Sequence, residues 1–564
     1  MNEMSWKEYK EHPHTIVSVI EKWAKERPNK IAIIIYDTEK QYTFKEFNNA
    51  INMIAYKLYN MGFRKGDIIT TSLPFLYEHI VLGYACAKIG VMWTPFDLRL
   101  KPPEIMQNLT LLKEKCKMFC HLGKTPLANF GLIGAAVKKN NPWLDFVVQF
   151  STPDDKYRAG IIPFYQIAEE AQNEIIEAKK NPESMNAFME ECAKVGEDDP
   201  VMIVFTTGST GYPKPAMLTN KSITCQNMCL SKGFDVDEND KMLVNLPPSH
   251  VGGTTEQFMT PMFIGGTCVI LHIFDAEKTL DAIQKYKVTT FGQIPAMFIM
   301  QWRLRNYDDY DISSLKFALY GGQAVDRTFL ERLSKMAPKF GSGFGLTESS
   351  GFCTFTPLDG TIDDILASIG TDYPIYPMTI RNPIKEDGSA GVELNDGEIG
   401  EICFEGPQNF LGYFGNEKAT RETLSTDGVL YTGDIGYKDD NGLHLSGRRK
   451  YIIKPKGFQV FPPDVEAFIA EIPQVEFVGV IGAKHEVFTD GIVAYIKVKE
   501  GQTLTEEQVF EHCKGIAAYK RPSLVMFLDE FPLNRVAKTD YVILKERVEK
   551  DVEEARAKGG WDAQ

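Results

Sequence analysis

The chain has 564 residues, which is too long for one hydrophobic core, so we expect at least two domains. Its 43% hydrophobic and 24% charged residues are typical of a globular protein. The formal charge of −14 argues against a general nucleic-acid-binding role, because such a role needs an excess of Lys and Arg. A local basic patch for nucleotide phosphates remains compatible with this charge.

Neither a membrane span nor a secretion signal is expected. The longest apolar stretch, residues 81–96, is interrupted by Lys88 and falls short of the roughly 18 apolar residues that a spanning helix needs. The start of the chain is charged and has no apolar segment behind it, unlike a signal peptide. We therefore expect a cytoplasmic protein without a nucleic-acid partner, either a monomer or a homo-oligomer.

The N-terminal part alternates short apolar runs with amphipathic stretches, which is typical of strands and helices in turn. The predicted elements are a strand at 30–36, a helix at 43–61, a strand at 67–71 and a helix at 77–87. Thr43 and Glu46 have the spacing of a capping box at the start of the first helix. This alternation predicts α/β layers with a largely parallel sheet.

A change in composition predicts the main domain boundary. Residues 434–447 are rich in Gly, Asp and Asn, and we place the boundary at the end of this stretch. The expected domains are therefore a large one over 1–447 and a small one over 448–564.

A buried strand predicted at 201–205 leads directly into a loop rich in hydroxyl groups. The loop is Thr206-Thr207-Gly208-Ser209-Thr210-Gly211-Tyr212-Pro213-Lys214. Its glycines allow tight turns that point backbone N–H groups inward, and the hydroxyls and the lysine add further donors for anionic oxygens. The spacing is neither that of a Walker A motif nor that of a dinucleotide fingerprint. A loop that binds polyphosphate is predicted, with a flexible surface loop as the alternative.

This loop resembles the signature loop of the adenylate-forming superfamily, which contains acyl-CoA synthetases, the adenylation domains of peptide synthetases and firefly-type luciferases. The superfamily usually continues Lys-Gly, whereas here Pro215 follows Lys214. Proline has no N–H, so one backbone contact that the family uses is in question.

Two further motifs resemble parts of the superfamily's nucleotide site. Gly321-Gly322-Gln323, after an apolar run, resembles the turn beside the adenine, although a plain strand-to-helix turn is an alternative. The second motif is Phe344-Gly345-Leu346-Thr347-Glu348, which resembles Tyr-Gly-x-Thr-Glu. The resemblance assigns Thr347 to a phosphate. Glu348 is the expected Mg²⁺ ligand, because a carboxylate beside a triphosphate needs a bridging cation.

The C-terminal third contains three more matches. Tyr431-Thr432-Gly433-Asp434 resembles the ribose clamp, in which the carboxylate accepts bonds from both hydroxyls. Residues 447–460 resemble the hinge and the loop after it, although a solvated charged hairpin is the alternative. The resemblance assigns Arg448 to the nucleotide, Lys450 to the hinge, and Lys456, Gly457 and Phe458 to the loop that lines the thiol tunnel. Residues 531–538 resemble the closing motif, with Ala537 in place of Gly and with Lys538 holding the carboxylate against the α-phosphate.

The acyl side of the site is less well marked. His250 lies in a segment, 247–253, similar to the superfamily's aromatic-His-x-x-Gly element, whose ring gates the acyl pocket. The resemblance places pocket walls at Met297, Phe298, Phe344 and Phe352, which would suit a compact, apolar, cyclic acyl group. Aromatic residues are more often part of the core than of a pocket.

The resemblance implies a two-step reaction. ATP and a carboxylate give an acyl-adenylate and pyrophosphate, and the thiol of coenzyme A then gives acyl-CoA and AMP. The expected protein is an AMP-forming acyl-CoA synthetase that uses ATP, Mg²⁺ and coenzyme A, with a medium-chain, aromatic or alicyclic acid. Its large domain of layered α/β subdomains would hold the ATP and acyl site, and its small α+β domain would be a mobile lid. The alternatives are transfer to a carrier protein and a non-catalytic nucleotide-binding relative.

Overall fold

A computed structural model describes residues 2–125, 128–151, 155–207, 213–455, 458, 460–485, 489–533, 539–559 and 561. The contacts divide the chain into two compact units. The described residues of the first unit lie within Met1–Thr207, Pro213–Met378 and Phe404–Leu430, and those of the second lie within Thr379–Cys403 and Tyr431–Gln564. The boundary after residue 447 is not tested by this division and stays a prediction.

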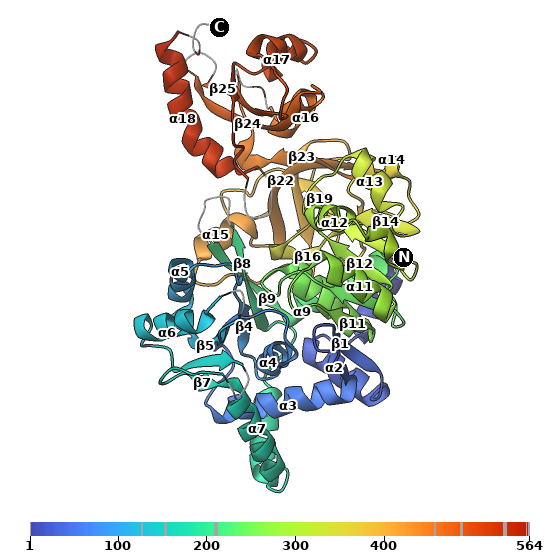
Figure 1. The fold of residues 1–564 in the computed structure, drawn as a ribbon, viewed down its shortest axis with the longest axis vertical. Helices are drawn as coiled ribbons and strands as arrows, with labels where there is room; N and C mark the ends of the chain where they lie inside the picture. The colour runs from blue at the N-terminus through green and yellow to red at the C-terminus, as the bar shows by residue number, and fades with distance from the viewer. Residues whose placement is uncertain are drawn as a thin grey trace. The chain divides into compact units, whose positions relative to one another are not determined.

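One sheet of the first unit has eight strands, in the order β21-β9-β8-β4-β3-β5-β6-β7. Figure 1 labels β4, β5, β7, β8 and β9 of this sheet. The strands are β3 (Ile68–Ser72), β4 (Met92–Pro95), β5 (Cys116–Leu122), β6 (Phe146–Phe150), β7 (Ile162–Pro163), β8 (Pro200–Thr207), β9 (Pro213–Thr219) and β21 (Gly412–Tyr413). Strands β3 to β8 run parallel to one another, whereas β9 is antiparallel to both β8 and β21. The largely parallel sheet predicted from the sequence is confirmed.

Helices precede and connect the parallel strands of this sheet. They are α3 (Phe44–Asn60), α4 (Tyr77–Lys88), α5 (Pro102–Leu112), α6 (Phe130–Asn140), α7 (Phe164–Ala178) and α8 (Pro182–Cys192). Helix α3 leads into β3 from the other large sheet, and the rest connect strands of this one. The capping box predicted for α3 is confirmed: Thr43 Oγ1 accepts from the Glu46 N–H at 3.2 Å, and a Glu46 carboxylate oxygen accepts from the Thr43 N–H at 2.8 Å. Reciprocal caps of this kind fix where a helix begins, because they satisfy two otherwise unpaired donors.

The other large sheet of the first unit has seven strands, in the order β14-β13-β12-β10-β11-β1-β2. The strands are β1 (Ile31–Ile35), β2 (Gln41–Thr43), β10 (Lys241–Val244), β11 (Thr267–Ile270), β12 (Thr290–Gln293), β13 (Phe317–Tyr320) and β14 (Lys339–Ser342). All neighbours are parallel except β2, which is antiparallel to β1. The carboxyl ends of β10, β12, β13 and β14 therefore lie along one edge of the sheet.

The helices and short elements around this sheet complete the first unit. They are α1 (Asn2–Glu11), α2 (Ile16–Glu26), α9 (Asn220–Gly233), the π-helix η1 (Gly252–Met259), α10 (Thr260–Ile264), α11 (Ala276–Tyr286), α12 (Pro295–Trp302), η2 (Tyr307–Asp309), α13 (Arg327–Leu333), β15 (Gly345–Leu346), η3 (Thr347–Ser349), β16 (Gly351–Phe352), β17 (Thr354–Phe355), α14 (Ile362–Ala367), β18 (Thr371–Asp372) and α15 (Glu417–Thr423).

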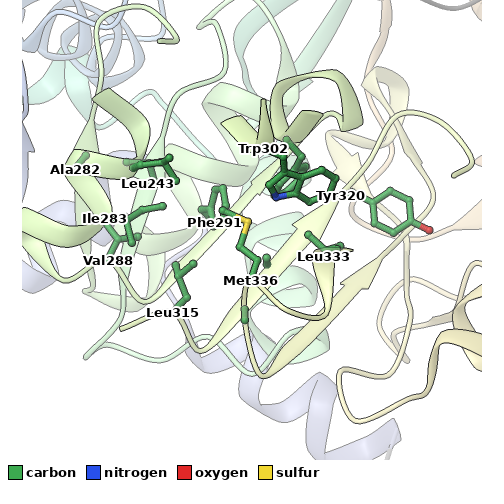
Figure 2. Close-up of a cluster of buried hydrophobic side chains, with 14 of the residues drawn as sticks. Leu243, Ala282, Ile283, Val288, Phe291, Trp302, Leu315, Tyr320, Leu333 and Met336 are labelled. Atoms are coloured by element: carbon green, nitrogen blue, oxygen red, sulfur yellow. The ribbon is translucent and has the colours of Figure 1, made fainter. Parts of the chain in front are cut away.

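A large apolar cluster holds helices against the seven-stranded sheet. Leu243 of β10, Phe291 of β12 and Tyr320 of β13 meet Trp302 of α12 and Leu333 of α13 in this cluster (Figure 2). Burying each side chain of this size contributes roughly 1.5–3 kcal/mol. The cluster thus fixes the strand ends from which the loops of the candidate site emerge.

The second unit contains a four-stranded sheet in the order β19-β20-β22-β23 and a three-stranded sheet in the order β24-β25-β26. The elements are β19 (Met378–Arg381), β20 (Gly400–Glu405), β22 (Val429–Asp439), β23 (Gly442–Arg448), η4 (Arg449–Tyr451), α16 (Pro462–Ala470), β24 (Val475–His485), β25 (Thr489–Val498), α17 (Glu506–Cys513), η5 (Ala518–Lys520), β26 (Leu524–Phe527) and α18 (Tyr541–Ala557). The first unit includes Met378 of β19, the end of β20 from Phe404, and the start of β22 up to Leu430.

The three-stranded sheet is covered on both faces. Along β25, Ile492 and Ala494 pack with residues of α16 and α17, whereas Val493 and Tyr495 pack with residues of α18. Side chains alternate between the two faces of a strand, so one apolar run serves two separate cores. The predicted small α+β domain is confirmed as a fold; its mobility stays a prediction. None of the helices among the described residues is long and apolar enough to cross a membrane.

Candidate active site

The predicted site residues of the first unit lie on segments that follow the carboxyl ends of parallel strands. His250 follows β10, Met297 lies on the helix after β12, Gly321 follows β13 directly, and Glu348 comes soon after β14. Ligands of open parallel sheets bind outside this edge, because the loops there converge. The sheet thus gathers motifs that are far apart in the sequence.

Glu348 is held by Tyr413, a residue that the sequence did not point to. The Tyr413 hydroxyl donates to Glu348 Oε1 at 2.5 Å, and the Phe410 N–H donates to the Glu348 carbonyl at 2.9 Å. The pKa of Tyr413 is raised by burial first and by the negative charge of Glu348 second. The hydroxyl is thus a donor at neutral pH, and it fixes one carboxylate oxygen.

Lys214 lies over the same ring. Its Nζ atom is 5.0 Å from the centroid of Tyr413, within the range of a cation–π contact. The pairing of Tyr413 with Ala216 of β9 brings the ring beside Lys214. Tyr413 therefore connects two residues that the sequence assigned to phosphate and metal. Nothing in the sequence around Tyr413 signals this, because the connection depends on the pairing of distant strands.

The predicted phosphate loop joins β8 to β9. Thr206 Oγ1 donates to the Lys214 carbonyl at 3.5 Å, and Thr207 is the last residue of β8. The middle of the loop, Gly208, Ser209, Thr210 and Gly211, lies outside the described residues, and its role stays a prediction. Pro215 pairs with Phe205 of β8, and its carbonyl accepts from the Phe414 N–H at 2.8 Å, so the residue that replaces the usual glycine is part of the sheet.

The surroundings of Glu348 fit a Mg²⁺ ion bound mainly through a substrate. Only one Glu348 oxygen is engaged by Tyr413, and the side chain is half-buried. No group of three or more His, Cys, Asp or Glu side chains that could hold a metal occurs in the described part of the chain. Mg²⁺ usually takes one or two carboxylates and completes its shell with waters and phosphate oxygens. Thr347 and Glu348 begin the short helix η3, next to Gly345 of β15 and to Phe344, whose ring lies 6.2 Å from that of Phe404.

The turn at Gly321-Gly322-Gln323 has a backbone that favours glycine. Gly322 has φ +90°, which strains any residue with a side chain. A Cβ atom at Gly321 would lie 3.0 Å from Phe352 Cζ, so the Phe352 ring packs directly on this turn. Gln323 is exposed. The predicted adenine-side turn is therefore open on one side and covered by Phe352 on the other.

His250 is exposed and its ring is oriented by the backbone. The Gly252 N–H donates to His250 Nδ1 at 3.0 Å. In the neutral ring this bond assigns the proton to Nε2. The His250 carbonyl in turn accepts from the Gly253 N–H at 3.0 Å, at the start of η1. The sequence could predict the residue but not the tautomer.

The prediction that Phe298 forms a wall of the acyl pocket is wrong. Phe298 is fully buried within the apolar cluster on the seven-stranded sheet, with its ring 5.4 Å from Phe291 and 5.9 Å from Phe329. It is a core residue because the first turn of α12 points it toward the sheet. Met297, its neighbour, is 7% exposed.

In the second unit, two predicted nucleotide residues are in direct contact. Asp434 pairs with Arg448 across β22 and β23, and Arg448 Nε lies 2.8 Å from Asp434 Oδ1. The Asp434 side chain is only 6% exposed, whereas that of Arg448 is 53% exposed. Thr432 Oγ1 accepts from the Asp434 N–H at 3.1 Å. A buried carboxylate is thus presented beside a guanidinium that reaches solvent.

Glu401 supports this turn and was missed by sequence reasoning. Its carboxylate accepts from the Gly433 N–H at 3.0 Å and pairs with Arg449 at 2.7 Å. Burial raises the pKa of Glu401, and the charge of Arg449 opposes this. Gly433 has φ +74°, so the buried carboxylate holds a turn that needs glycine.

The remaining predicted residues of the second unit are only partly described. Lys450 lies with its Nζ atom 4.3 Å from the Tyr451 ring centroid, and Phe458 is 53% exposed and stacks on Tyr519 at 4.6 Å. Lys456, Gly457, Ala537 and Lys538 lie outside the described residues, so their roles stay predictions.

Known proteins with similar sequences are acid–CoA ligases by name. 4-coumarate–CoA ligase 4 of Arabidopsis thaliana is 27% identical over 88% of this chain and 84% of the relative. The putative acyl-CoA synthetase YngI of Bacillus subtilis is 25% identical over 94% of this chain and 97% of the relative. Among solved structures, ATP-bound MatB from Rhodopseudomonas palustris superposes with a TM-score of 0.73 at 22% identity, over 94% of this chain and 98% of the other.

The family comparison covers most of the chain. The family described as AMP-binding enzyme matches residues 20–414, and the one described as AMP-binding enzyme C-terminal domain matches residues 464–538. The predicted boundary after residue 447 lies in the interval between the two matches. Together with the relatives, these matches show that the chain belongs to the AMP-binding, adenylate-forming enzymes, close to the acyl-CoA ligases.

Proposed function

We propose that this protein is an AMP-forming acid–CoA ligase whose acid is medium-chain, aromatic or alicyclic. The observation that carries the proposal is the array of Lys214, Tyr413 and Glu348, which combines a cation and a fixed carboxylate beside the predicted phosphate loop. The names of relatives at 25–27% identity over most of the chain support coenzyme A as the acceptor and, for the plant enzymes, an aromatic acid.

In the first step, a carboxylate oxygen of the acid attacks the α-phosphorus of ATP and pyrophosphate leaves. Two anions must approach each other, so the protein has to place positive charge where negative charge develops. Lys214 supplies an ammonium, and Lys538 is proposed to bridge the carboxylate and the α-phosphate. Mg²⁺ held by Glu348 would neutralise phosphate charge.

In the second step, the thiol sulfur of coenzyme A attacks the acyl carbon, and AMP leaves with the electron pair of the broken acyl–phosphate bond. Asp434 is proposed to accept hydrogen bonds from the ribose hydroxyls, with Arg448 beside it on the nucleotide. The segment around Gly457 is proposed to line the thiol's path after the smaller domain has turned at Lys450.

The experiment measures the two steps separately. Acid-dependent exchange of pyrophosphate into ATP reports the first step, and CoA-dependent AMP release with mass detection of acyl-CoA reports the second. The panel should contain short, medium, aromatic and alicyclic acids. We expect exchange and acyl-CoA with at least one class.

A matched pair of variants tests the site. Glu348→Gln should lower turnover and change the Mg²⁺ dependence, whereas Glu331→Gln, an exposed carboxylate on α13, should change neither. Exchange without acyl-CoA would favour a carrier protein as acceptor. ATP binding without exchange by any acid would refute the proposal in favour of a non-catalytic relative.

A further inference from the structure

The turn that follows Glu348 has a strained backbone. Ser350, which ends η3, has φ +59°, and Gly351 after it has φ +136°. Glycine adopts such angles readily, but a residue with a side chain is strained there. Ser350 is also fully buried. A strained backbone persists only where its surroundings hold it in place, and such positions gather at functional sites.

One amide group closes this turn. The Gln408 Nε2 atom donates to the Ser349 carbonyl at 2.9 Å and to the Phe352 carbonyl at 2.8 Å. These two carbonyls flank Ser350 and Gly351, so the side chain bridges the strained residues. Because both partners can only accept, they assign the nitrogen of the amide, and not its oxygen, to this position.

Packing alone does not account for a glutamine at position 408. The Gln408 side chain is fully buried, and its Oε1 atom has no hydrogen-bond partner in the part of the chain that the structure describes. A buried acceptor without a partner destabilises a protein, and an apolar side chain of similar size would avoid this cost. The two bonds of Nε2 are therefore what the amide contributes.

The segment that carries Gln408 also holds Glu348 itself. The Phe410 N–H donates to the Glu348 carbonyl at 2.9 Å, and the Tyr413 hydroxyl donates to Glu348 Oε1 at 2.5 Å. Tyr413 pairs with Ala216 of β9, the strand that also contains Lys214. Residues 408–413 therefore connect the strained turn, the predicted metal ligand and the strand after the predicted phosphate loop.

The bonds from η1 to the same turn do not replace those of Gln408. Thr255 Oγ1 donates to the Ser350 carbonyl at 2.6 Å, and Glu256 of η1 accepts from the Phe352 N–H through Oε1 at 2.8 Å. Neither bond reaches the carbonyl of Ser349, the residue next to Glu348. The Gln408 amide holds that carbonyl and the far end of the turn together.

We propose that Gln408 is a positioning residue for the predicted Mg²⁺ ligand: its amide keeps the strained turn closed, so that the Glu348 carboxylate stays at the Tyr413 hydroxyl. The inference rests on the proposed function, because Glu348 is assigned to the nucleotide phosphates of that same site. Without the two bonds, Ser350 relaxes from its positive φ, and Glu348, directly before the turn, changes its position. Gln408 thus acts through Glu348 and not on the substrates.

The two steps of the proposed reaction should respond differently to the loss of this amide. Glu348 is proposed to act while pyrophosphate leaves ATP, whereas transfer of the acyl group from a preformed acyl-adenylate involves no triphosphate. Removing the Gln408 amide should therefore slow the first step more than the second. The ratio of the two rates in one protein sample is independent of how much of that sample is folded.

The experiment compares the wild type with Gln408→Met, Gln408→Asn and the control Gln149→Met. Methionine has a similar length and no donor, and asparagine is one methylene shorter, so it cannot span both carbonyls. Gln149 is 2% exposed, and its Nε2 atom also donates twice, to the Ser151 hydroxyl at 2.8 Å and to the Lys156 carbonyl at 3.3 Å. It lies on β6, between β5 and β7, and so tests the loss of a buried amide alone.

Two measurements are made on each protein. Pyrophosphate exchange and transfer from a synthetic acyl-adenylate to CoA give the ratio of the two steps. The second measurement needs no turnover: electron paramagnetic resonance follows the binding of Mn²⁺ in the presence of α,β-methylene-ATP, which cannot be cleaved between these phosphates. Mn²⁺ takes the same oxygen ligands as Mg²⁺.

We expect both Gln408 variants to lower the ratio of exchange to transfer about tenfold and to raise the apparent Kd for Mn²⁺ about tenfold, because groups that orient a metal ligand have effects of this size. Gln149→Met should change neither quantity. An unchanged ratio or an unchanged Kd in a folded Gln408 variant overturns the inference. Failure of both variants to fold also overturns it, because Gln408 is then required by the fold itself. If the wild type shows no exchange with any acid, the proposed function is refuted instead, and the Mn²⁺ measurement alone decides the role of Gln408.

Discussion

Replacing Glu256 with glutamine should stabilise the first unit above neutral pH and have little effect near pH 5. Burial raises the pKa of this carboxyl from its ordinary 4.5 to about 7, and the hydrogen bond from the Phe352 N–H opposes the shift only in part. The folded protein therefore holds the proton more tightly than the unfolded chain does. Glutamine has the same shape and no proton to lose.

The sign and size follow from this difference. Stability contributed by the protonated carboxyl is fully present below pH 4.5 and is lost as the pH rises through 7. A difference of 7 − 4.5 = 2.5 in pKa corresponds to an upper limit of about 3 kcal/mol in the free energy of unfolding. Because the Glu256 side chain is half-buried, solvent screening reduces this value, and we expect about 1–3 kcal/mol.

Other titratable groups lie near η1. The titratable side chains on the elements packed against it are Lys221, Cys225, Cys229 and Lys232 of α9, Lys241 of β10, Cys268 of β11 and Cys353 after β16, with His250 before η1. Burial raises the pKa values of Cys229, Cys268 and Cys353, so these thiols stay neutral. Lys221 pairs with Asp198, Lys232 pairs with Glu8, and Lys241 donates to the Tyr286 carbonyl. His250 is present in wild type and variant alike.

Urea unfolding at pH 5, 6, 7 and 8 measures the effect. The assay compares the wild type, Glu256→Gln and Glu331→Gln by tryptophan fluorescence, using the transition of the first unit. The midpoint of Glu256→Gln should move above that of the wild type as the pH rises, while Glu331→Gln follows the wild type. Curves for wild type and Glu256→Gln that stay parallel from pH 5 to 8 would refute a buried, desolvated carboxyl at this position.

Three further outcomes are expected. Gly351→Ala should destabilise the first unit by about 2 kcal/mol in thermal unfolding, because its Cβ atom meets Glu256 and Gln226 at φ +136°. The control Gly428→Ala, in the same unit and at φ +87° with open space around it, should cost only the backbone strain of about 1 kcal/mol. Tyr413→Phe keeps the ring beside Lys214 but removes the hydrogen bond to Glu348. The kcat/KM for ATP should therefore fall about tenfold, and the Mg²⁺ concentration needed for activity should rise. An unchanged Mg²⁺ titration would contradict the role of the hydroxyl. Lys538→Ala should lose pyrophosphate exchange but still transfer the acyl group of a synthetic acyl-adenylate to CoA. Gly457→Leu should keep pyrophosphate exchange but lose transfer of the acyl group to CoA. Equal loss of both steps in each variant would exclude a domain that alternates between two roles.

The features that the sequence predicted well depend on short separations along the chain. The capping box at Thr43 joins residues three apart, and the contact between Asp434 and Arg448 joins two adjacent antiparallel strands. The parallel order of the strands followed from their alternation with helices. Local patterns of this kind can be recognised in the sequence, because residues that are close along the chain make contact independently of the rest of the fold.

The features that were missed depend on contacts between distant segments. Tyr413 reaches Glu348 only because β21 adds to β9, and no pattern around Tyr413 encodes that pairing. Phe298 was assigned to a pocket wall because an aromatic side chain fits a pocket as well as a core in sequence terms. Burial in the cluster around Phe291 decides between the two.

Glu256 and Glu348 lie in the same unit but have opposite surroundings. Glu348 accepts from the Tyr413 hydroxyl, and the Lys214 ammonium lies over that ring, so its neighbours are suited to a charged carboxylate. Glu256 accepts from one backbone N–H, and no Lys or Arg among the described residues pairs with it, so burial raises its pKa to about 7 and favours the protonated form. Two carboxylates that differ in this way take different partners. The first suits a bridging cation beside phosphate, whereas the second favours a protonated carboxyl in the interior of the first unit.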